Sequence, residues 1–282
     1  MHKMEIARTP EELRLHADAW RELGHTLALV PTMGALHAGH MALVEEAKRH
    51  ADVVMVSIFV NPKQFGPGED YERYPRQQEQ DLEKLRKAGV NLAWLPAVED
   101  IYPDGFATTV HVEGPARVKL EDAHRPGHFD GVATVVAKLF ILSGCHVAVF
   151  GEKDYQQLLV IRRMTADLGL PVNIIAAPTV REEDGLAMSS RNAYLTREQR
   201  QKAPRIHAEL LRAAKRLHAG ASAEAVAFDG RQALQKAGFA VDYFTVRNAE
   251  TLQPVQDQHA EPMRILCAAR LDGVRLIDNI AT

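Results

Sequence analysis

The segment Pro31-Thr32-Met33-Gly34-Ala35-Leu36-His37-Ala38-Gly39-His40 decides the fold of this 282-residue chain. It follows the apolar run 27–30, which is typical of a buried strand, and precedes residues 41–48, whose pattern is typical of an amphipathic helix. Two glycines and two histidines therefore stand at a strand-to-helix turn. Glycine lets the backbone approach a ligand closely, and free amides at a helix start attract anions. Both histidine rings can face one bound group, for which a triphosphate is the natural candidate.

The spacing of His37 and His40 is also compatible with zinc. A zinc site needs a third ligand and usually an activating carboxylate, and no His-Glu-x-x-His pattern supplies them here. Histidines beside a turn can also be caps or surface residues, since a short motif is a hypothesis until its context fits. The strand before the motif and the helix after it favour a nucleotide.

The composition is that of an ordinary globular protein, with 46% hydrophobic and 25% charged residues. A formal net charge of -3 gives no general attraction to nucleic acid or to an anionic membrane, so we expect neither as a partner. No apolar run approaches the roughly 20 residues that span a bilayer. Residues 1–6 lead into a charged helical pattern and lack a signal-peptide core, so we expect a cytoplasmic protein. Cys145 and Cys267 lie in apolar stretches and are predicted to be buried, inert thiols.

Apolar strands alternate with amphipathic helices over the first two-thirds of the chain. The predicted strands are residues 27–30, 53–60, 92–95, 146–150 and 172–176, and the predicted helices are residues 41–48, 76–88, 131–142 and 153–168. This alternation predicts an α/β fold with a Rossmann-like, doubly wound parallel sheet that binds ligands at the carboxyl ends of its strands. We assign residues 1–180 to this domain.

The pattern changes beyond about residue 180. The predicted elements there are helices at 197–219 and 223–237 and strands at 241–246, 264–269 and 274–277. Residues 181–282 are therefore expected to form a smaller α+β domain. Segments 66–70 and 120–127 contain glycine or proline and are predicted to be mobile loops that could close over a site. Residues 109–112 are a candidate edge strand for a subunit interface.

The polar segment Asn61-Pro62-Lys63-Gln64-Phe65-Gly66 begins where the second long strand ends. An amide at that position, such as Gln64, can bind a hydroxyl or a carboxylate of a small substrate. Asn-Pro is also a common strand terminator, so a turn and a binding site explain this segment equally well.

A second polar segment, residues 151–157, follows a later strand. Lys153 can pair with a phosphate, Asp154 can accept hydrogen bonds from ribose hydroxyls, and Gln157 lies one turn after Lys153. A charged, solvated helix start is the alternative, because acidic residues favour that position in any case. The location beside the other strand ends favours a binding site.

A third polar segment, Met188-Ser189-Ser190-Arg191-Asn192, lies at the domain junction. Arginine offers a fixed fork of donors and serine adapts to its partner, which suits a triphosphate clamp. The two serines could instead cap the following helix. Thr196, which precedes Arg197-Glu198-Gln199, is the better cap candidate and leaves the serines for ligand binding.

Together these segments resemble the pantoate-β-alanine ligase, or pantothenate synthetase, family. The resemblance covers about residues 27–195, includes Arg125-Pro126-Gly127-His128-Phe129, and departs from the family pattern at Leu142-Ser143-Gly144-Cys145. It implies that ATP and (R)-pantoate form pantoyl adenylate and diphosphate, and that the amine of β-alanine then gives pantothenate and AMP. No protein nucleophile is needed for this chemistry. Another His-x-Gly-His nucleotidyltransferase and a non-catalytic nucleotide-binding module are the alternatives.

The resemblance also implies roles for individual residues. The ATP-binding residues would be Met33, Gly34, Ala35, Leu36, His37, Ala38, Gly39, His40, Gly151, Glu152, Lys153, Asp154, Val180, Met188, Ser189, Ser190 and Arg191. The catalytic residues, which disperse charge on the phosphates, would be His37, His40, Lys153, Ser190 and Arg191. The family assigns His40 as a proton donor, whereas charge stabilisation is the role that we expect.

For the small substrates, the resemblance implies that Gln64 holds pantoate and β-alanine and that Gln157 holds pantoate. The apolar wall for the geminal methyls of pantoate would comprise Pro31, Met33, Val135 and Val136. Mg²⁺ is expected to accompany ATP through phosphate oxygens and water, with Asp81 as a candidate for an indirect contact. The family further implies a homodimer.

Overall fold

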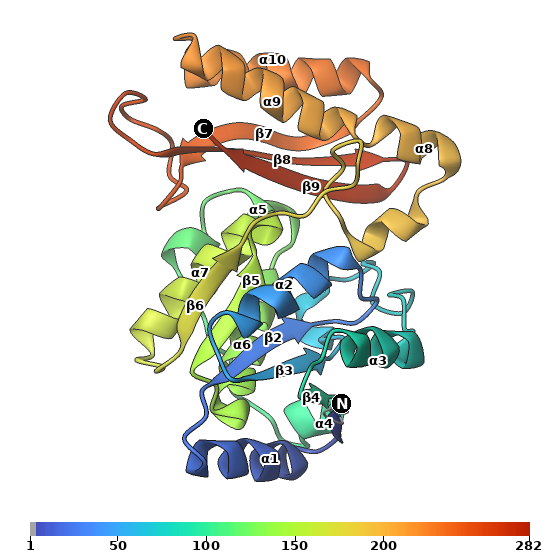
Figure 1. Cartoon of the computed structure of the whole chain (residues 1–282). Helices are drawn as coiled ribbons and strands as arrows, with labels where there is room; N and C mark the ends of the chain where they lie inside the picture. Colours follow the sequence, from blue (N-terminus) through green and yellow to red (C-terminus); the bar gives the residue numbers. More distant parts are fainter. Residues whose placement is uncertain (1–3) are drawn as a thin grey trace.

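The computed structural model describes residues 4–282 and contains two sheets, each with its own helices (Figure 1). The N-terminal sheet is entirely parallel, and its strands lie in the order β1-β4-β3-β2-β5-β6. These strands are β1 (Glu5–Ala7), β2 (Leu27–Thr32), β3 (Val53–Ile58), β4 (Leu92–Trp94), β5 (Val147–Gly151) and β6 (Asn173–Ala177). The strand order reverses between β2 and β5, so the ligand crevice of a doubly wound sheet is expected at their carboxyl ends.

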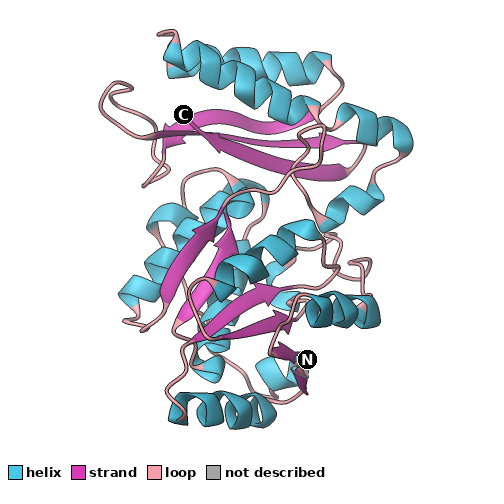
Figure 2. Ribbon diagram, viewed as in Figure 1, coloured by secondary structure: helices cyan, strands magenta, loops and turns pink. Residues whose placement is uncertain are grey.

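Helices cover both faces of the N-terminal sheet (Figure 2). The longer ones are α1 (Pro10–Glu22), α2 (Ala38–Lys48), α3 (Gln78–Lys87), α6 (His128–Ser143) and α7 (Tyr155–Asp167). One face packs against α2 and α3, and the other packs against α1, α6 and α7. The central strands are continuous apolar runs because both of their faces are buried. The predicted Rossmann-like, doubly wound α/β fold is therefore confirmed.

Short elements lie in the connections of this domain. They are the helices α4 (Val98–Ile101) and α5 (Glu121–His124) and the 3-10 turns η1 (Pro62–Gln64), η2 (Gly114–Ala116), η3 (Glu152–Asp154) and η4 (Ser190–Tyr194). Turn η3 directly follows β5, whereas residues 59–61 separate η1 from β3, which ends at Ile58 rather than at the predicted residue 60. Both polar segments predicted from the sequence therefore lie in the connections that leave strand ends.

The C-terminal sheet is antiparallel, with the order β7-β8-β9. Its elements are α8 (Arg197–Lys202), α9 (Arg205–His218), α10 (Ala223–Lys236), β7 (Ala240–Asn248), β8 (Met263–Leu271) and β9 (Val274–Ala281). Helices α9 and α10 share a buried core with this sheet, where Leu210, Leu234 and Cys267 have no solvent exposure. Gly230 lets α10 approach β7 closely, because a Cβ at this position would come within 2.4 Å of the Phe244 ring. The predicted smaller α+β domain is confirmed.

Two helix predictions are wrong in detail. The N-terminal segment forms β1 before α1 rather than leading directly into a helix, and residues 1–3 of that prediction lie outside the described residues. Three residues are too few to show strand periodicity. The single helix predicted over 197–219 is two helices, α8 and α9, because Pro204 has no N–H to continue the hydrogen-bond ladder.

One strand prediction and one loop prediction are also corrected. Residues 109–112 form no strand; instead the Val110 N–H donates to Thr134 Oγ1 at 2.9 Å. The segment 120–127 is not an open loop, because it contains α5 and buries Glu121 against the C-terminal sheet. There the carboxylate of Glu121 accepts hydrogen bonds from Arg275 and from Tyr243.

Both cysteines are buried free thiols, as expected from the sequence. Burial raises the pKa of the Cys145 thiol to about 11, so it stays protonated near neutral pH. Within residues 4–282, none of the helices combines the length and the apolar character that are needed to cross a bilayer.

Candidate active site

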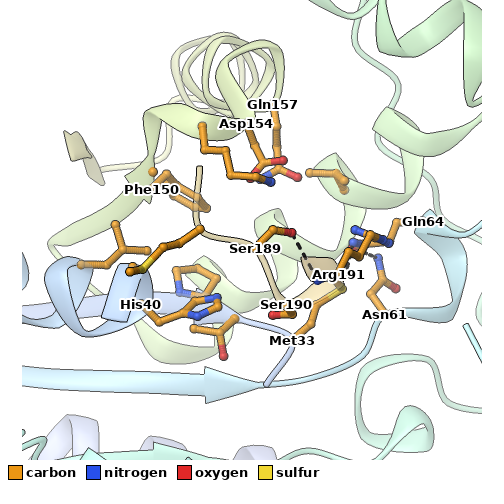
Figure 3. A pocket seen from close by; sticks show the side chains of 18 of the residues that line it. Met33, His40, Asn61, Gln64, Phe150, Asp154, Gln157, Ser189, Ser190 and Arg191 are labelled. Carbon is orange, nitrogen blue, oxygen red and sulfur yellow. Dashed lines mark hydrogen bonds and ion pairs between the residues drawn. The ribbon is translucent and has the colours of Figure 1, made fainter. Parts of the chain in front are cut away.

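A cavity of about 220 Å³ lies where the carboxyl ends of β2, β3 and β5 meet the chain that joins the two sheets (Figure 3). The predicted residues that line it are Pro31, Met33, His37, Gly39, His40, Gln64, Val135, Val136, Gly151, Lys153, Asp154, Gln157, Val180, Met188, Ser189, Ser190 and Arg191. In Figure 3 the side chains of His40, Gln64, Asp154 and Gln157 surround one space, although they come from segments far apart in the sequence.

Five predicted ATP-binding residues do not line this cavity; they are Gly34, Ala35, Leu36, Ala38 and Glu152. Ala35 and Leu36 are buried residues of the turn itself, and their N–H groups donate to the two carboxylate oxygens of Asp81 at 2.8 Å each. Glu152 points to the C-terminal sheet, where its carboxylate pairs with Arg264 at 2.9 Å.

The buried carboxylate of Asp81 holds the turn in place. Asp81 is 1% exposed, and Lys84 supports the same turn by donating to the Leu36 carbonyl at 2.6 Å. Gly34 has a φ of +84°, and a Cβ there would come within 3.1 Å of Asp81, so the tight turn requires glycine. Asp81 does not line the cavity, and the predicted indirect contact of Asp81 with Mg²⁺ has no support in this geometry.

Helix α2 begins at Ala38, three residues before the predicted start, so the two histidines belong to its N-terminus. The His37 N–H donates to His40 Nδ1 at 3.2 Å, and the Gly39 N–H donates to His37 Nδ1 at 3.1 Å. These amides, like those of Ala35 and Leu36, are used within the protein. The prediction that they would be free to bind an anion is therefore wrong.

The same hydrogen bonds fix the histidine tautomers. Each Nδ1 accepts an amide proton, so a neutral ring carries its own proton on Nε2. Burial, assisted by the Lys153 and Lys84 ammonium groups, lowers the pKa of His37 to about 4. Burial also lowers the pKa of His40 to about 3, with His37 and Lys153 adding to the effect. Near pH 7 both imidazoles are therefore neutral groups with one N–H donor each.

The turn η3 and the start of α7 supply the polar side chains opposite the histidines. The Lys153 ammonium is largely buried and lies 3.6 Å from the Asp154 carboxylate. Gln157 lines the same cavity one helical turn further on. The predicted spacing therefore brings all three side chains to one wall.

The Ser189–Arg191 segment packs against the turn that carries the two histidines. The Ser190 hydroxyl donates to the Ala35 carbonyl at 3.1 Å, which joins the chain between the sheets to the histidine turn. Thr196 caps α8, as predicted, but Ser189 is also a cap, because its hydroxyl accepts the Arg191 N–H at 3.3 Å. Only part of the hydrogen-bonding capacity of the serines is thus left for a ligand.

The loop that follows η1 contacts two arginines of the cavity wall. Asp70 accepts two hydrogen bonds from Arg191, both at 2.9 Å. Its neighbour Glu69 accepts two from Arg125, at 2.8 and 2.7 Å. The segment predicted as a mobile loop is therefore bound to the cavity by two bidentate ion pairs, which are the strongest geometry for an arginine and a carboxylate.

Gln64 is oriented by a residue that the sequence analysis gave no role. Asn61 is 1% exposed, and its Nδ2 donates to Gln64 Oε1 at 3.1 Å and to the Gly131 carbonyl at 3.1 Å. The Tyr102 hydroxyl in turn donates to Asn61 Oδ1 at 2.7 Å. With its oxygen occupied, the Gln64 amide has its Nε2 side beside Met33 Sδ, at 3.1 Å.

Further lining residues were not predicted. They are Thr32, Leu43, Phe59, Asn61, Tyr74, Arg125, His128, Val132, Leu139, Phe150, Pro178 and Thr179. His128 Nδ1 donates to the Gln64 carbonyl at 2.9 Å, and Arg125 donates to His128 Nε2 at 3.0 Å. Both residues belong to a segment that was noted for its resemblance, and the packing of α6 on η1 brings His128 to the cavity.

Comparison with known proteins gives one consistent result. A family model described as pantoate-beta-alanine ligase matches residues 5–281. A pantothenate synthetase from Rhodopseudomonas palustris (strain HaA2) is 54% identical over 276 residues, which is 98% of each chain. A pantothenate synthetase from Nitrobacter hamburgensis is 55% identical over 275 residues, which is 98% of this chain and 97% of the relative.

Solved structures agree with the sequence matches. The crystal structure of pantothenate synthetase from Thermus thermophilus superposes with a TM-score of 0.92 at 50% identity, over 98% of this chain and 99% of that one. A pantoate-beta-alanine ligase from Francisella tularensis, in complex with beta-gamma ATP and β-alanine, superposes with a TM-score of 0.84 at 35% identity, over 99% and 98% of the two chains. This chain therefore belongs to the pantoate-β-alanine ligase family.

Proposed function

We propose that this chain condenses (R)-pantoate with β-alanine at the expense of ATP, giving pantothenate, AMP and diphosphate through pantoyl adenylate. One observation carries the proposal: a single cavity is lined by cationic groups, N–H donors, two glutamine amides and a group of apolar side chains. The Francisella relative, which binds a nucleotide and β-alanine, supports the same assignment.

The cationic groups and N–H donors suit a triphosphate. Lys153 and Arg191, which also pair with Asp154 and Asp70, supply cationic donors, and the neutral rings of His37 and His40 supply N–H donors from Nε2. Donors that are already oriented stabilise charge that develops in a transition state without reorganisation. Asp154 is suited to accept hydrogen bonds from ribose hydroxyls. We keep as ATP-binding residues only those predicted ATP-binding residues that line the cavity.

The two glutamine amides suit a small hydroxy acid. Gln64 and Gln157 offer donors for its carboxylate or hydroxyl groups, and Gln64 also lies within reach of an incoming amine in this proposal. Six apolar side chains line the same cavity, and they are Phe59, Val132, Val135, Val136, Leu139 and Phe150. Such a lining favours a branched aliphatic group, like the geminal methyls of pantoate, over a polar one.

The proposed chemistry has two steps. A carboxylate oxygen of pantoate attacks the α-phosphorus of ATP, and the bond from that phosphorus to the diphosphate oxygen breaks. The nitrogen of β-alanine then attacks the acyl carbon, AMP leaves with the electron pair of the broken C–O bond, and the amine loses a proton. The pKa of about 3 at His40 favours its action as a neutral hydrogen-bond donor rather than as a proton donor in the first step.

Magnesium is expected to arrive with the nucleotide. Within the part of the chain that the structure describes, no group of three or more His, Cys, Asp or Glu side chains has metal-binding geometry. The carboxylates of Glu69 and Asp70 are paired with arginines, and Asp81 is bound by backbone amides. Phosphate oxygens and water are therefore the ligands that we propose, which is a common mode for Mg²⁺.

The proposal extends to the organisation of the protein. We assign residues 1–180 to the nucleotide- and pantoate-binding domain and residues 181–282 to a domain that covers it. We further propose a homodimer, on the basis of the family, to be tested by sedimentation equilibrium. Because ATP is a substrate of the proposed reaction, we expect the enzyme to act in the cytoplasm.

The decisive experiment is pantoate-dependent exchange of labelled diphosphate into ATP, with Mg²⁺ present and β-alanine absent. Exchange that requires pantoate would establish the first step, and addition of β-alanine would then test the second. Absence of exchange in folded protein that binds ATP would reject the ligase proposal. Release of diphosphate with a different acceptor would indicate another nucleotidyltransferase, and ATP binding without any turnover would indicate a binding module.

A further inference from the structure

We propose that Asn279, in β9 of the C-terminal sheet, is a positioning residue for Lys153 and hence for formation of the adenylate. This inference rests on the proposed function, in which Lys153 contacts the phosphates. Asn279 lies outside both the resemblance seen in the sequence and the cavity lining. It acts on the backbone of the turn that carries Lys153.

The contacts of Asn279 are complete and cross from one sheet to the other. Its Nδ2 donates to the carbonyl oxygens of Glu152 and Lys153, at 3.0 and 2.9 Å. Its Oδ1 accepts from Arg264 Nε at 2.6 Å. Asn279 is 3% exposed, so water cannot easily replace these bonds. The amide can adopt only one orientation, because a flip would face its oxygen towards two carbonyl oxygens.

Arg264 fixes that orientation. It is 6% exposed, and its guanidinium lies 3.6 Å from the ring centroid of Tyr155, the first residue of α7. Its Nη2 also donates to the Glu152 carboxylate at 2.9 Å. One buried arginine thus holds Asn279, the side chain of Glu152 and the start of α7. Buried polar groups are costly unless they are bonded, so this arrangement is strongly specified.

The turn that receives these bonds needs an external support. The three residues of η3 join β5 to α7, and no side-chain cap closes the start of either η3 or α7. The two carbonyls held by Asn279 belong to the peptide units on either side of the Lys153 Cα, so they fix the backbone from which the Lys153 side chain projects. Misplacement of a catalytic group by about 1 Å costs on the order of a hundredfold in rate. The C-terminal sheet therefore contributes to the active site by orienting Lys153.

The test is a double-mutant cycle on diphosphate exchange, with Asn279→Asp, Lys153→Ala and the combination. Asn279→Asp keeps the size of the side chain but places oxygen against the two carbonyls. We expect it to lower exchange at least about tenfold, and to lower it no further when Lys153 is already alanine. A purely structural role would instead multiply the two losses, and exchange like that of the wild type would overturn the inference directly.

A matched control removes another buried contact between the sheets. Tyr243→Phe deletes the hydrogen bond of 2.7 Å to Glu121 without touching η3, and we expect exchange within about twofold of the wild type. If Asn279→Asp fails to fold, Arg264→Lys takes its place in the cycle. It keeps a cation for Glu152 but loses the Nε that holds Asn279, so the same loss and the same lack of additivity are expected.

ATP affinity separates this inference from the proposed function. Calorimetric titration of the same variants with ATP measures the phosphate contacts of Lys153 without any turnover. If the wild type binds ATP but shows no exchange, the ligase proposal fails. A weaker affinity in Asn279→Asp that vanishes in the Lys153→Ala background would still support the positioning role. Unchanged affinity in Asn279→Asp, with unchanged exchange, would refute it.

Discussion

His40 Nδ1 accepts the backbone N–H of His37 at 3.2 Å, so the second histidine of the motif caps the helix on which it stands. The same bond leaves Nε2 as the only ring nitrogen of His40 that can donate. A glycine between the two histidines is required, because a Cβ at Gly39 would come within 2.8 Å of the His37 ring. The motif therefore orients two neutral N–H donors, the Nε2–H groups of His37 and His40.

Replacement of His40 tests that role. We expect His40→Ala to lower adenylate formation at least about a hundredfold, the scale for loss of one preorganised donor to a transition state. Diphosphate exchange measures the effect. His40→Gln serves as the control for capping, because a glutamine at this helix position can still accept the His37 N–H. It should recover stability but not activity; near-normal exchange in either folded variant would remove His40 from the mechanism.

Replacement of Gln64 should separate the two substrates. Gln64→Ala removes an amide that lines the cavity and that Asn61 orients, so we expect a higher KM for pantoate with little change in ATP affinity. Tyr102→Phe should shift the same KM less, since it loosens Asn61 without removing the amide. Initial rates over a range of pantoate concentrations measure this KM in each variant. A pantoate dependence like that of the wild type in Gln64→Ala would contradict the assigned contact.

Stability should fall on mild acidification because of His128. Burial, assisted by Arg125, lowers its pKa to about 4, whereas an unfolded chain has the ordinary value near 6.5. Between these values the unfolded chain binds a proton that the folded one does not, so the free energy of unfolding decreases as pH falls. His128 leaves the free energy of unfolding unchanged above pH 6.5, and it lowers that free energy by about 2 kcal/mol at pH 5.

Urea unfolding at pH 7 and pH 5 measures this loss. Protonation of His128 would occur at Nε2, which now accepts from Arg125, so the physical cause is a broken bond and a buried like charge. His128→Asn cannot titrate in this range and should show a smaller fall. His37 and His40 contribute in the same direction and remain in the variant. An equal fall in the variant and the wild type would exclude His128 as a cause.

Gly131 should be intolerant of alanine. It lies in α6 directly below η1, and a Cβ there would come within 2.1 Å of the Lys63 carbonyl oxygen. The helix and the turn must then separate, so we expect Gly131→Ala to destabilise the protein by about 1–3 kcal/mol. Because η1 carries Gln64, the KM for pantoate should rise as well. Thermal unfolding and initial rates check both effects, and an unchanged melting temperature would show that the turn can yield freely.

The sequence predicts the centre of the fold better than its edges. Strands β2, β3 and β5 are buried on both faces and therefore appear as continuous apolar runs. The short strand β1 gives no such signal, since parallel pairing with β4 defines it. The break between α8 and α9 could have been predicted from Pro204, whose missing N–H interrupts a helix.

The candidate site likewise contains residues that the sequence predicts and residues that only the structure reveals. Residues in the segments that leave strand ends, such as Gln64 and Lys153, are predictable because the ends of parallel strands meet at one edge. Asn61 and His128 could be assigned only once the approach of α6 to η1 was known. Asn279 gives no sequence signal at all, because it lies within a strand of the other sheet. Its contacts depend entirely on how the two sheets meet.

The use of the turn amides by Asp81 has a consequence for ligand energetics. In a glycine-rich phosphate loop, one short stretch of backbone can hold an anion by itself. Here the amides of Ala35 and Leu36 are already satisfied, so they are not available to an anionic ligand, and side chains from distant parts of the chain supply donors instead. Lys153 and Arg191 are two of them. ATP would then act as a crosslink between separate segments, so saturating nucleotide should protect the amides of η3 and η4 from hydrogen exchange together.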